Sequence, residues 1–118
     1  MINSVISVAE VRSIAINVIS SFFKQLFFVP NDIEMEEKLR LIYDLITKLA
    51  NSSKWVERQE YVLLCERLVM DCSIPFDVFT KEMLDYMLDA SHDKVANVRL
   101  AVARSITRTF WSIGNLIE

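Results

Sequence analysis

The chain has 118 residues, of which 53% are hydrophobic and 25% are charged, with one glycine and two prolines. This length allows one compact unit and excludes a two-domain enzyme, while the composition excludes a disordered chain. A single glycine argues against a β fold rich in hairpins, and a net charge of -3 offers no general attraction to nucleic acid or anionic membranes. The sequence therefore predicts one all-α domain over residues 1–118, with neither nucleic acid nor a membrane as partner.

The first helix is predicted over residues 8–28. Ser7 and Glu10 have the spacing of a capping box, apolar residues then recur every three or four positions, and Pro30 ends the pattern. The segment 14–29 is the most membrane-like stretch, but polar residues interrupt it and it is shorter than a transmembrane span. A small protein anchored in a membrane by this segment is a minor alternative, and such a protein would need detergent for extraction.

Four phenylalanines distinguish this first helix, and they place aromatic surface on more than one side of it. They are Phe22, Phe23, Phe27 and Phe28. The end units of a helical array normally have a polar outer face, which these residues do not provide. We therefore expect the helix to mediate self-association or to bind another helical protein.

The second helix is predicted to follow a cap at Asn31 or Asp32 and to end near Ala50. Acidic residues fill its first turns, where the helix dipole is positive, and they fan around the axis instead of converging as a cation site would. No metal site is predicted there. The expected buried stripe consists of Leu39, Ile42, Leu45, Ile46 and Leu49.

Three further helices are predicted over residues 55–72, 77–91 and 97–113. Each has apolar residues at helical spacing, and the residues around Pro75 separate the first of them from the second. Asn97 is expected to cap the last helix and Gly114 to end it. His92, in the polar turn before that helix, is predicted to be an ordinary loop residue.

The two cysteines, Cys65 and Cys72, are predicted to be unpaired core residues. On one helix they lie about 10 Å apart, which is beyond the reach of a disulfide. Unpaired thiols with apolar neighbours, in a sequence without a signal-peptide cleavage pattern, favour a reducing compartment. We expect the protein in the cytoplasm, and the nucleus is a further expected location.

An internal repeat relates three of the predicted helices. They align on Arg12, Arg58 and Arg99, which are 46 and 41 residues apart. Periods of about 40 to 47 residues with two helices per unit are typical of helical solenoids. The expected fold is an α-α superhelix of about five helices in two and a half repeats, with a half repeat over 1–30 and full repeats over 31–73 and 74–118.

The last unit resembles a HEAT repeat in the sequence from Met83 to Asp89 and in Asp93-Lys94-Val95-Ala96-Asn97-Val98-Arg99. Together with Ser53-Lys54-Trp55 and the Asp71 to Pro75 segment, it is similar to the C-terminal HEAT repeats of scaffold and regulatory subunits of serine/threonine protein phosphatases of the 2A and 4 types. The resemblance implies a non-catalytic scaffold whose partner is a phosphatase catalytic subunit.

The resemblance also implies roles for individual residues. Asp93 and Arg99 would form a ladder between neighbouring repeats, with Arg12 and Arg58 as the equivalent arginines. The catalytic subunit would contact the turns within repeats. By position, these contacts would come from Ser53, Lys54 and Trp55 in one turn and from Lys94, Val95 and Asn97 in the next.

Two of the predicted contact sites have a second interpretation. Trp55 has the profile of an interface anchor, but it is equally compatible with packing between the two helices of its own repeat. Arg104 and Arg108 form a basic ridge near Leu100 and Trp111 that could receive an acidic partner or a further repeat, although a solvated helix face is the simpler interpretation.

No catalytic constellation is evident in the sequence. His92 has no nucleophile at a known spacing, and neither a glycine-rich phosphate loop nor paired histidines are present. We therefore predict no enzyme activity and no cofactor. A generic HEAT or TOG-like interaction module, for example one that binds tubulin through Trp55 and Lys54, is the alternative function.

Overall fold

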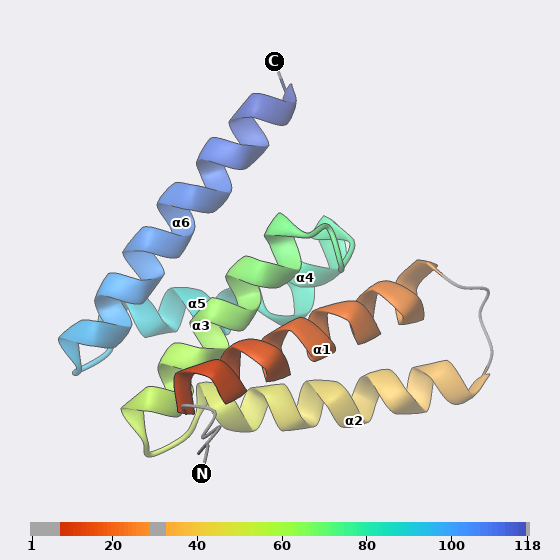
Figure 1. The fold of residues 1–118 in the computed structure, drawn as a ribbon, viewed down its shortest axis with the longest axis horizontal. Helices are drawn as coiled ribbons and strands as arrows, with labels where there is room; N and C mark the ends of the chain where they lie inside the picture. The colour runs from red at the N-terminus through yellow and green to blue at the C-terminus, as the bar shows by residue number, and fades with distance from the viewer. Residues whose placement is uncertain (1–7, 29–32, 118) are drawn as a thin grey trace, which may run out of the picture.

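The computed structural model describes residues 8–28 and 33–117, and within these ranges the chain is helical with no strand (Figure 1). The predicted all-α class is confirmed. The elements are α1 (Val8–Phe28), α2 (Ile33–Ala50), α3 (Trp55–Met70), α4 (Phe76–Glu82), α5 (Leu84–Asp89), a 3₁₀ turn η1 (Ala90–His92) and α6 (Ala96–Ile117).

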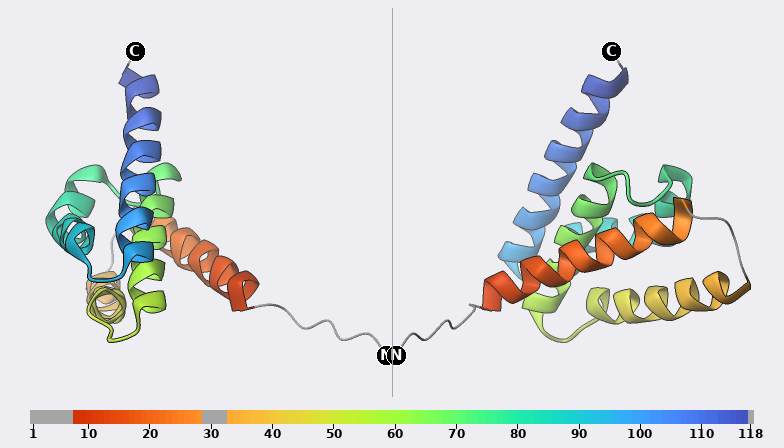
Figure 2. Two further views of the ribbon diagram at one scale, coloured as in Figure 1. Left: turned by 90° about the vertical axis from the view of Figure 1, so that its left-hand side faces the viewer. Right: turned by 45° about the vertical axis from the view of Figure 1, so that its right-hand side comes forward.

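The helices form two layers of a helical-repeat fold. In Figure 1 the long helices α1, α3 and α6 begin on the same side of the molecule and run in similar directions, whereas α2 and the α4–α5 segment return the opposite way. The first view of Figure 2 shows α1 on one side of the overlapping α3 and α6, and the α4–α5 segment on the other. Helix α3 packs against α1, α2 and α6, so it is the centre of the stack.

The hydrophobic core is built around α3. Its buried residues contact α1 and α2 on one side and α5 and α6 on the other, and burial of each large apolar side chain contributes about 2 kcal/mol. The core residues that are at most 1% exposed include Phe23, Tyr61, Val62, Leu64, Cys65, Leu68, Met83 and Val102.

The buried stripe of α2 differs from the prediction at one position. Ile46 is buried and Leu39, Ile42 and Leu49 are half-buried, but Leu45 is 63% exposed. Helix α2 is covered on one side only, and Leu45 lies about 100° around the helix axis from Ile46, away from that cover. The predicted burial of Leu45 is therefore wrong.

Helix α3 ends earlier than predicted, at Met70, because the chain turns into a left-handed conformation at Cys72, where φ is 52°. The N–H of Cys72 donates to the carbonyl of Val69, and the N–H of Ser73 donates to the carbonyl of Leu68. This pattern is a Schellman motif, with cysteine in the place usually taken by glycine. Cys72 is exposed, so its predicted core role is wrong, whereas Cys65 is buried.

The predicted fourth helix is divided at Met83, where φ is -126°. The buried hydroxyl of Tyr61 donates to the Met83 carbonyl at 2.8 Å. The same carbonyl accepts the Met87 N–H at 3.3 Å, so Tyr61 adds a second bond there and fixes α4 and α5 to the centre of α3. Helical periodicity alone does not reveal such a break, because α4 and α5 keep nearly the same buried face.

The last helix is longer than predicted at both ends. It begins at Ala96, one residue before Asn97, and the Val95 carbonyl accepts bonds from the N–H groups of Val98 and Arg99. Asn97 is therefore in the first turn and is not the cap. The helix also continues past Gly114 to Ile117, because glycine in a helix costs only about 1 kcal/mol relative to alanine.

Helix α1 has the predicted bounds, and the predicted caps Ser7, Asn31 and Asp32 lie outside the described residues. None of the helices in the described ranges combines the length and hydrophobicity that crossing a bilayer requires.

Candidate functional site

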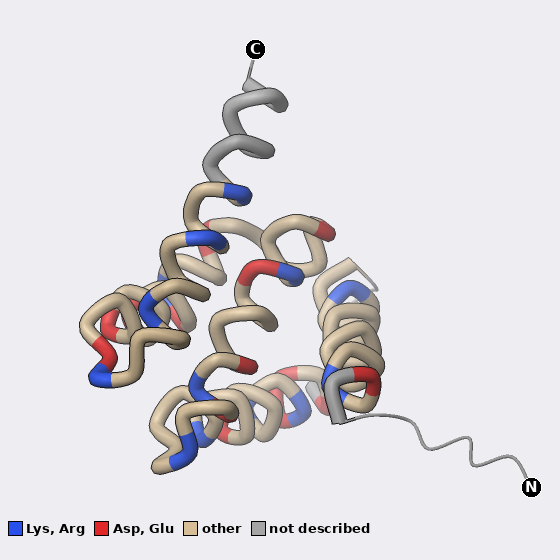
Figure 3. Tube along the Cα trace, turned by 60° about the vertical axis from the view of Figure 1, so that its left-hand side comes forward, with Lys and Arg blue, Asp and Glu red and all other residues tan. Residues whose placement is uncertain are grey.

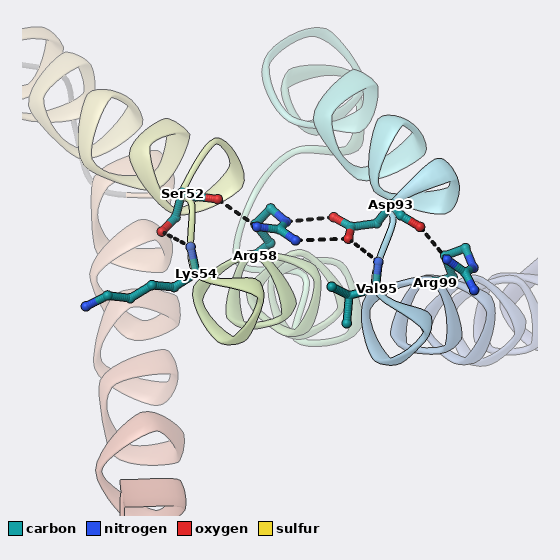
Figure 4. Close-up of polar contacts among 6 residues, drawn as sticks. All are labelled: Ser52, Lys54, Arg58, Asp93, Val95 and Arg99. Atoms are coloured by element: carbon teal, nitrogen blue, oxygen red, sulfur yellow. Dashed lines mark hydrogen bonds and ion pairs between the residues drawn. The ribbon is translucent and has the colours of Figure 1, made fainter.

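Two turns between paired helices lie together at one edge of the molecule, and Arg58 in the first turns of α3 joins them (Figure 4). Its Nη1 donates to the Ser52 carbonyl at 2.9 Å, while Nε and Nη2 donate to the two carboxylate oxygens of Asp93 at 2.7 and 3.0 Å. The side chains of Arg58 and Asp93 are only 13% and 8% exposed. A bidentate pair of this kind fixes both distance and orientation.

Asp93 also shapes its own turn. Its Oδ1 accepts the Val95 N–H at 2.9 Å, and its carbonyl accepts a bond from Arg99 Nη1 at 2.5 Å. The hydrogen bond from Arg58 lowers the pKa of the Asp93 carboxyl and raises the pKa of Arg58. The Asp93 carboxylate thus binds Arg58 of the preceding helix pair, while Arg99 of its own pair binds the backbone.

The turn between α2 and α3 is closed by Ser52. Its Oγ accepts the Lys54 N–H at 3.1 Å and donates to Glu57 Oε2 at 2.7 Å, so this side chain joins the turn to the first turn of α3. The contact residues predicted from this turn face outward. Ser53 and Lys54 are exposed, and Trp55, the first residue of α3, is 38% exposed.

The turn before α6 presents a similar group of residues. Lys94 and Asn97 are exposed, and Val95 is half-buried beside the Asp93 network. The two turns that contain the predicted contact residues therefore lie on either side of the Arg58–Asp93 pair, at the same edge of the molecule (Figures 1 and 4).

The remaining predicted arginines do not take part in this network. Arg12 of α1 forms an ion pair with Glu60 of α3 at 2.5 Å. Arg108 of α6 forms an ion pair with Glu66 of α3 at 3.1 Å, and Ser105 also donates to Glu66, at 3.0 Å. These partners were not identified from the sequence, because nothing in a helical pattern indicates which residues meet across a helix junction.

The other half of the predicted basic ridge, Arg104, is exposed. Leu100, which was expected beside it, is 49% exposed. The side chain of Trp111 lies outside the described residues.

The outer face of α1 is apolar and exposed. Val11, Ile14 and Val18 are more than half exposed, and Phe22 is 39% exposed. Of the other phenylalanines in this helix, Phe23 is buried, Phe27 is half-buried and Phe28 is exposed.

The titratable groups of the core are held in their neutral forms. Burial raises the pKa of Cys65 to about 12, and burial together with Glu82 raises the pKa of Tyr43 to about 12. No cluster of His, Cys, Asp and Glu suited to a metal ion occurs within the described part of the chain. The edge formed by the two turns offers hydrogen bonds, charge and one aromatic ring, which are the means of docking a partner.

These observations define an all-α helical-repeat protein in which a mostly buried ion pair joins neighbouring turns. The chain is also similar in sequence to proteins named as phosphatase regulatory subunits. Serine/threonine-protein phosphatase 4 regulatory subunit 1 of Rattus norvegicus is 29% identical to this chain over 103 residues, and the protein of the same name in Homo sapiens is 28% identical over 103 residues.

Each match covers 86% of this chain and 10% of the relative, so the chain spans about a tenth of the length of the relatives it matches. No protein-family model matches the chain. No solved structure matches it either.

Proposed function

We propose that this chain is a non-catalytic HEAT module of a serine/threonine phosphatase regulatory subunit, and that it binds the catalytic subunit through the turns between its paired helices. The observation that carries the proposal is the Arg58 network, which sets the Ser52 turn beside the Asp93 turn. Relatives named as regulatory subunits of phosphatase 4 match 86% of the chain and support the choice of partner.

The proposed contact surface is the edge formed by both turns. Trp55 would supply buried aromatic area, and Lys54 and Lys94 would supply positive charge on either side of it. Arg58 and Asp93 would act indirectly, since both are mostly buried and their role is to fix the spacing between the turns. The module would then position a catalytic subunit without contributing to its chemistry.

A binding assay with purified phosphatase 4 catalytic subunit tests this proposal. We expect Trp55→Ala to weaken binding by tenfold or more, the effect of losing an interface anchor worth about 1.4 kcal/mol or more. Phe28→Ala is the matched control, because Phe28 is an exposed aromatic residue on α1, away from the turns. Equal losses in the two variants, or no binding by the unmodified chain, would contradict the proposal.

A parallel assay with tubulin separates the alternative function. A TOG-like module would bind tubulin through Lys54 and Trp55, and that binding would weaken as salt screens the lysine. Binding to tubulin but not to the catalytic subunit would replace the phosphatase proposal. The cytoplasmic or nuclear location stays a prediction, which cell fractionation tests.

Self-association through α1 is a separate proposal, supported by the exposed apolar residues Ile14, Val18 and Phe22. Sedimentation velocity at tens of micromolar protein tests it. A strictly monomeric profile would contradict it, and a dimer that dissociates in Val18→Asp would support it.

A further inference from the structure

A groove runs along the outer side of α3, between α1 and α6, away from the turns that carry the proposed function. Its volume is about 530 Å³, within the range of ligand-binding clefts, and it is open along its length. Figure 3 shows the three helices that form it side by side, with basic residues on α6 and both charges on α3. Helix α2 and the α4–α5 segment do not line it.

Positive charge lies at the surface of this groove, and negative charge lies deeper. Arg12 and Arg108 are 39% and 58% exposed, while their carboxylate partners Glu60 and Glu66 are 22% and 12% exposed. Arg67 also lines the groove and is 44% exposed. Its ion pair with Asp71 is long, with 3.9 Å between Nη1 and Oδ1.

The groove therefore has an excess of hydrogen-bond donors. A guanidinium carries five N–H groups, and each of these ion pairs uses only one or two of them. Glu66, by contrast, already accepts bonds from Ser105 and Arg108. The complement of such a surface is an occupant that brings acceptors with negative charge.

Most of the exposed lining of the groove is apolar. Leu63 and Met70 of α3 are 37% and 44% exposed, and Ile16 of α1 is half-buried beside them. The two α3 residues are seven positions apart, which is about 10.5 Å along a helix. Apolar residues at positions i and i+7 of a second helix have the same spacing, so a helix lying along the groove could contact both.

We propose that this groove binds an amphipathic helix of a partner protein, with apolar residues two turns apart on one face and carboxylates on both sides of them. The apolar residues would cover Leu63 and Met70, and the carboxylates would receive the spare N–H groups of Arg12, Arg67 and Arg108. A phosphate-rich polymer fits less well, because it would leave Leu63 and Met70 uncovered and its negative charges would be repelled by Glu60 and Glu66. This site is separate from the turns and does not rest on the phosphatase proposal.

The test uses a synthetic helical peptide with leucines at positions i, i+3 and i+7 and glutamates on both sides of them. Its binding to the full chain is measured by fluorescence anisotropy. We expect Arg67→Glu to weaken binding about tenfold, because a rim charge becomes repulsive, and Leu63→Ser to weaken it about fivefold through lost apolar contact. Binding should also weaken when salt rises from about 50 to 500 mM.

The controls separate this site from a general attraction of charges. Arg40→Glu makes the same change of charge at an exposed position on α2, outside the groove, and should alter binding less than about twofold. The same peptide with lysines in place of glutamates should bind at least about tenfold more weakly. Circular dichroism and the urea midpoint establish that each variant is folded.

Four results would overturn the proposal. They are no binding of the glutamate peptide up to about 1 mM, equal binding of the lysine peptide, equal effects of Arg67→Glu and Arg40→Glu, and a dimer of the chain that dissociates in Arg67→Glu. The last result would assign the groove to a second copy. Peptide-induced NMR shifts centred on Ile16, Leu63 and Met70 would support the proposal, and shifts centred on Trp55 would contradict it.

Discussion

The junction between α3 and α6 and the junction between α1 and α3 use similar residues with different degrees of burial. At α3–α6 the bidentate Arg58–Asp93 pair is 13% and 8% exposed, and Glu66 receives bonds from two residues of α6. At α1–α3 the ion pair between Arg12 and Glu60 is 39% and 22% exposed, so water weakens it. The polar contacts of the two junctions therefore differ in strength.

The apolar contacts differ in the same direction. Helix α6 buries Val98, Ala101 and Val102, whereas α1 buries Phe23 and Leu26 and leaves a row of apolar residues exposed on its outer face. A buried hydrogen bond of 2.7 Å between Ser20 and Ser73 adds a specific contact to the α1 junction. In helical arrays the interfaces between neighbours supply much of the stability, so we expect α1 to separate before α6 does.

The largest expected effect comes from removing the main apolar anchor of α1. Phe23 is fully buried and its ring centre lies 5.9 Å from those of Phe27 and Tyr43. Phe23→Ala should cost about 3 to 4 kcal/mol of stability at the α1 junction. Hydrogen exchange should then accelerate in α1 amides more than in α6 amides.

Phe28→Ala is the control for this prediction, because Phe28 is 63% exposed and its loss should cost less than about 0.5 kcal/mol. Equal acceleration of exchange in α1 and α6 after Phe23→Ala would show that the two junctions unfold together. That result would contradict the expectation that α1 separates before α6.

The second prediction compares the two ion pairs directly. Arg58→Ala should lower the free energy of unfolding by about 2 kcal/mol, because it removes three hydrogen bonds and leaves a mostly buried carboxylate. Arg12→Ala should lower it by less than about 1 kcal/mol. Urea denaturation of both variants gives these values, and similar losses would contradict the assigned difference. Arg58→Lys should lose most of the same stability, since lysine cannot form the bidentate pair.

The third prediction concerns pH at the α3–α6 junction. Arg58 lowers the pKa of Asp93 in the folded chain, so the stability from this group is complete above its unfolded pKa of about 3.9 and is lost as pH falls through the folded pKa. The chain should therefore lose more stability than Asp93→Asn does as pH falls below about 4. Urea midpoints at several pH values measure this, and parallel curves for the two proteins would contradict it.

The smallest effect is expected at the end of α3, where Cys72 has a positive φ next to Asp71 and Ser73, the residues that bind Ser20 of α1. Cys72→Gly should raise the free energy of unfolding by about 0.5 to 1 kcal/mol, because glycine adopts this conformation without strain. If the α1 junction depends on this turn, hydrogen exchange in α1 should slow as well. A loss of stability would show that the cysteine side chain contributes a contact that glycine removes.

The predictable part of the structure is the part set by local pattern. The limits of α1, the existence of paired helices and the central position of the residues around Cys65 follow from apolar spacing and from breaks at proline. The same pattern failed at Leu45 and Cys72, because spacing along a helix does not say how much of its circumference a neighbour covers. It also failed at Met83, where a hydroxyl from another helix binds the backbone carbonyl between α4 and α5.

The sequence by itself determined the helices, their order and the two turns with charged and aromatic residues, because these depend on neighbours within a few positions. Only the tertiary structure decided that Asp93 binds Arg58, that Glu66 binds Ser105 and Arg108, and that Leu45 is exposed. Such partners are 35 to 42 residues apart in the chain. The packing of whole helices determines which of several similar arginines binds a given carboxylate. The local sequence around each residue does not specify that packing.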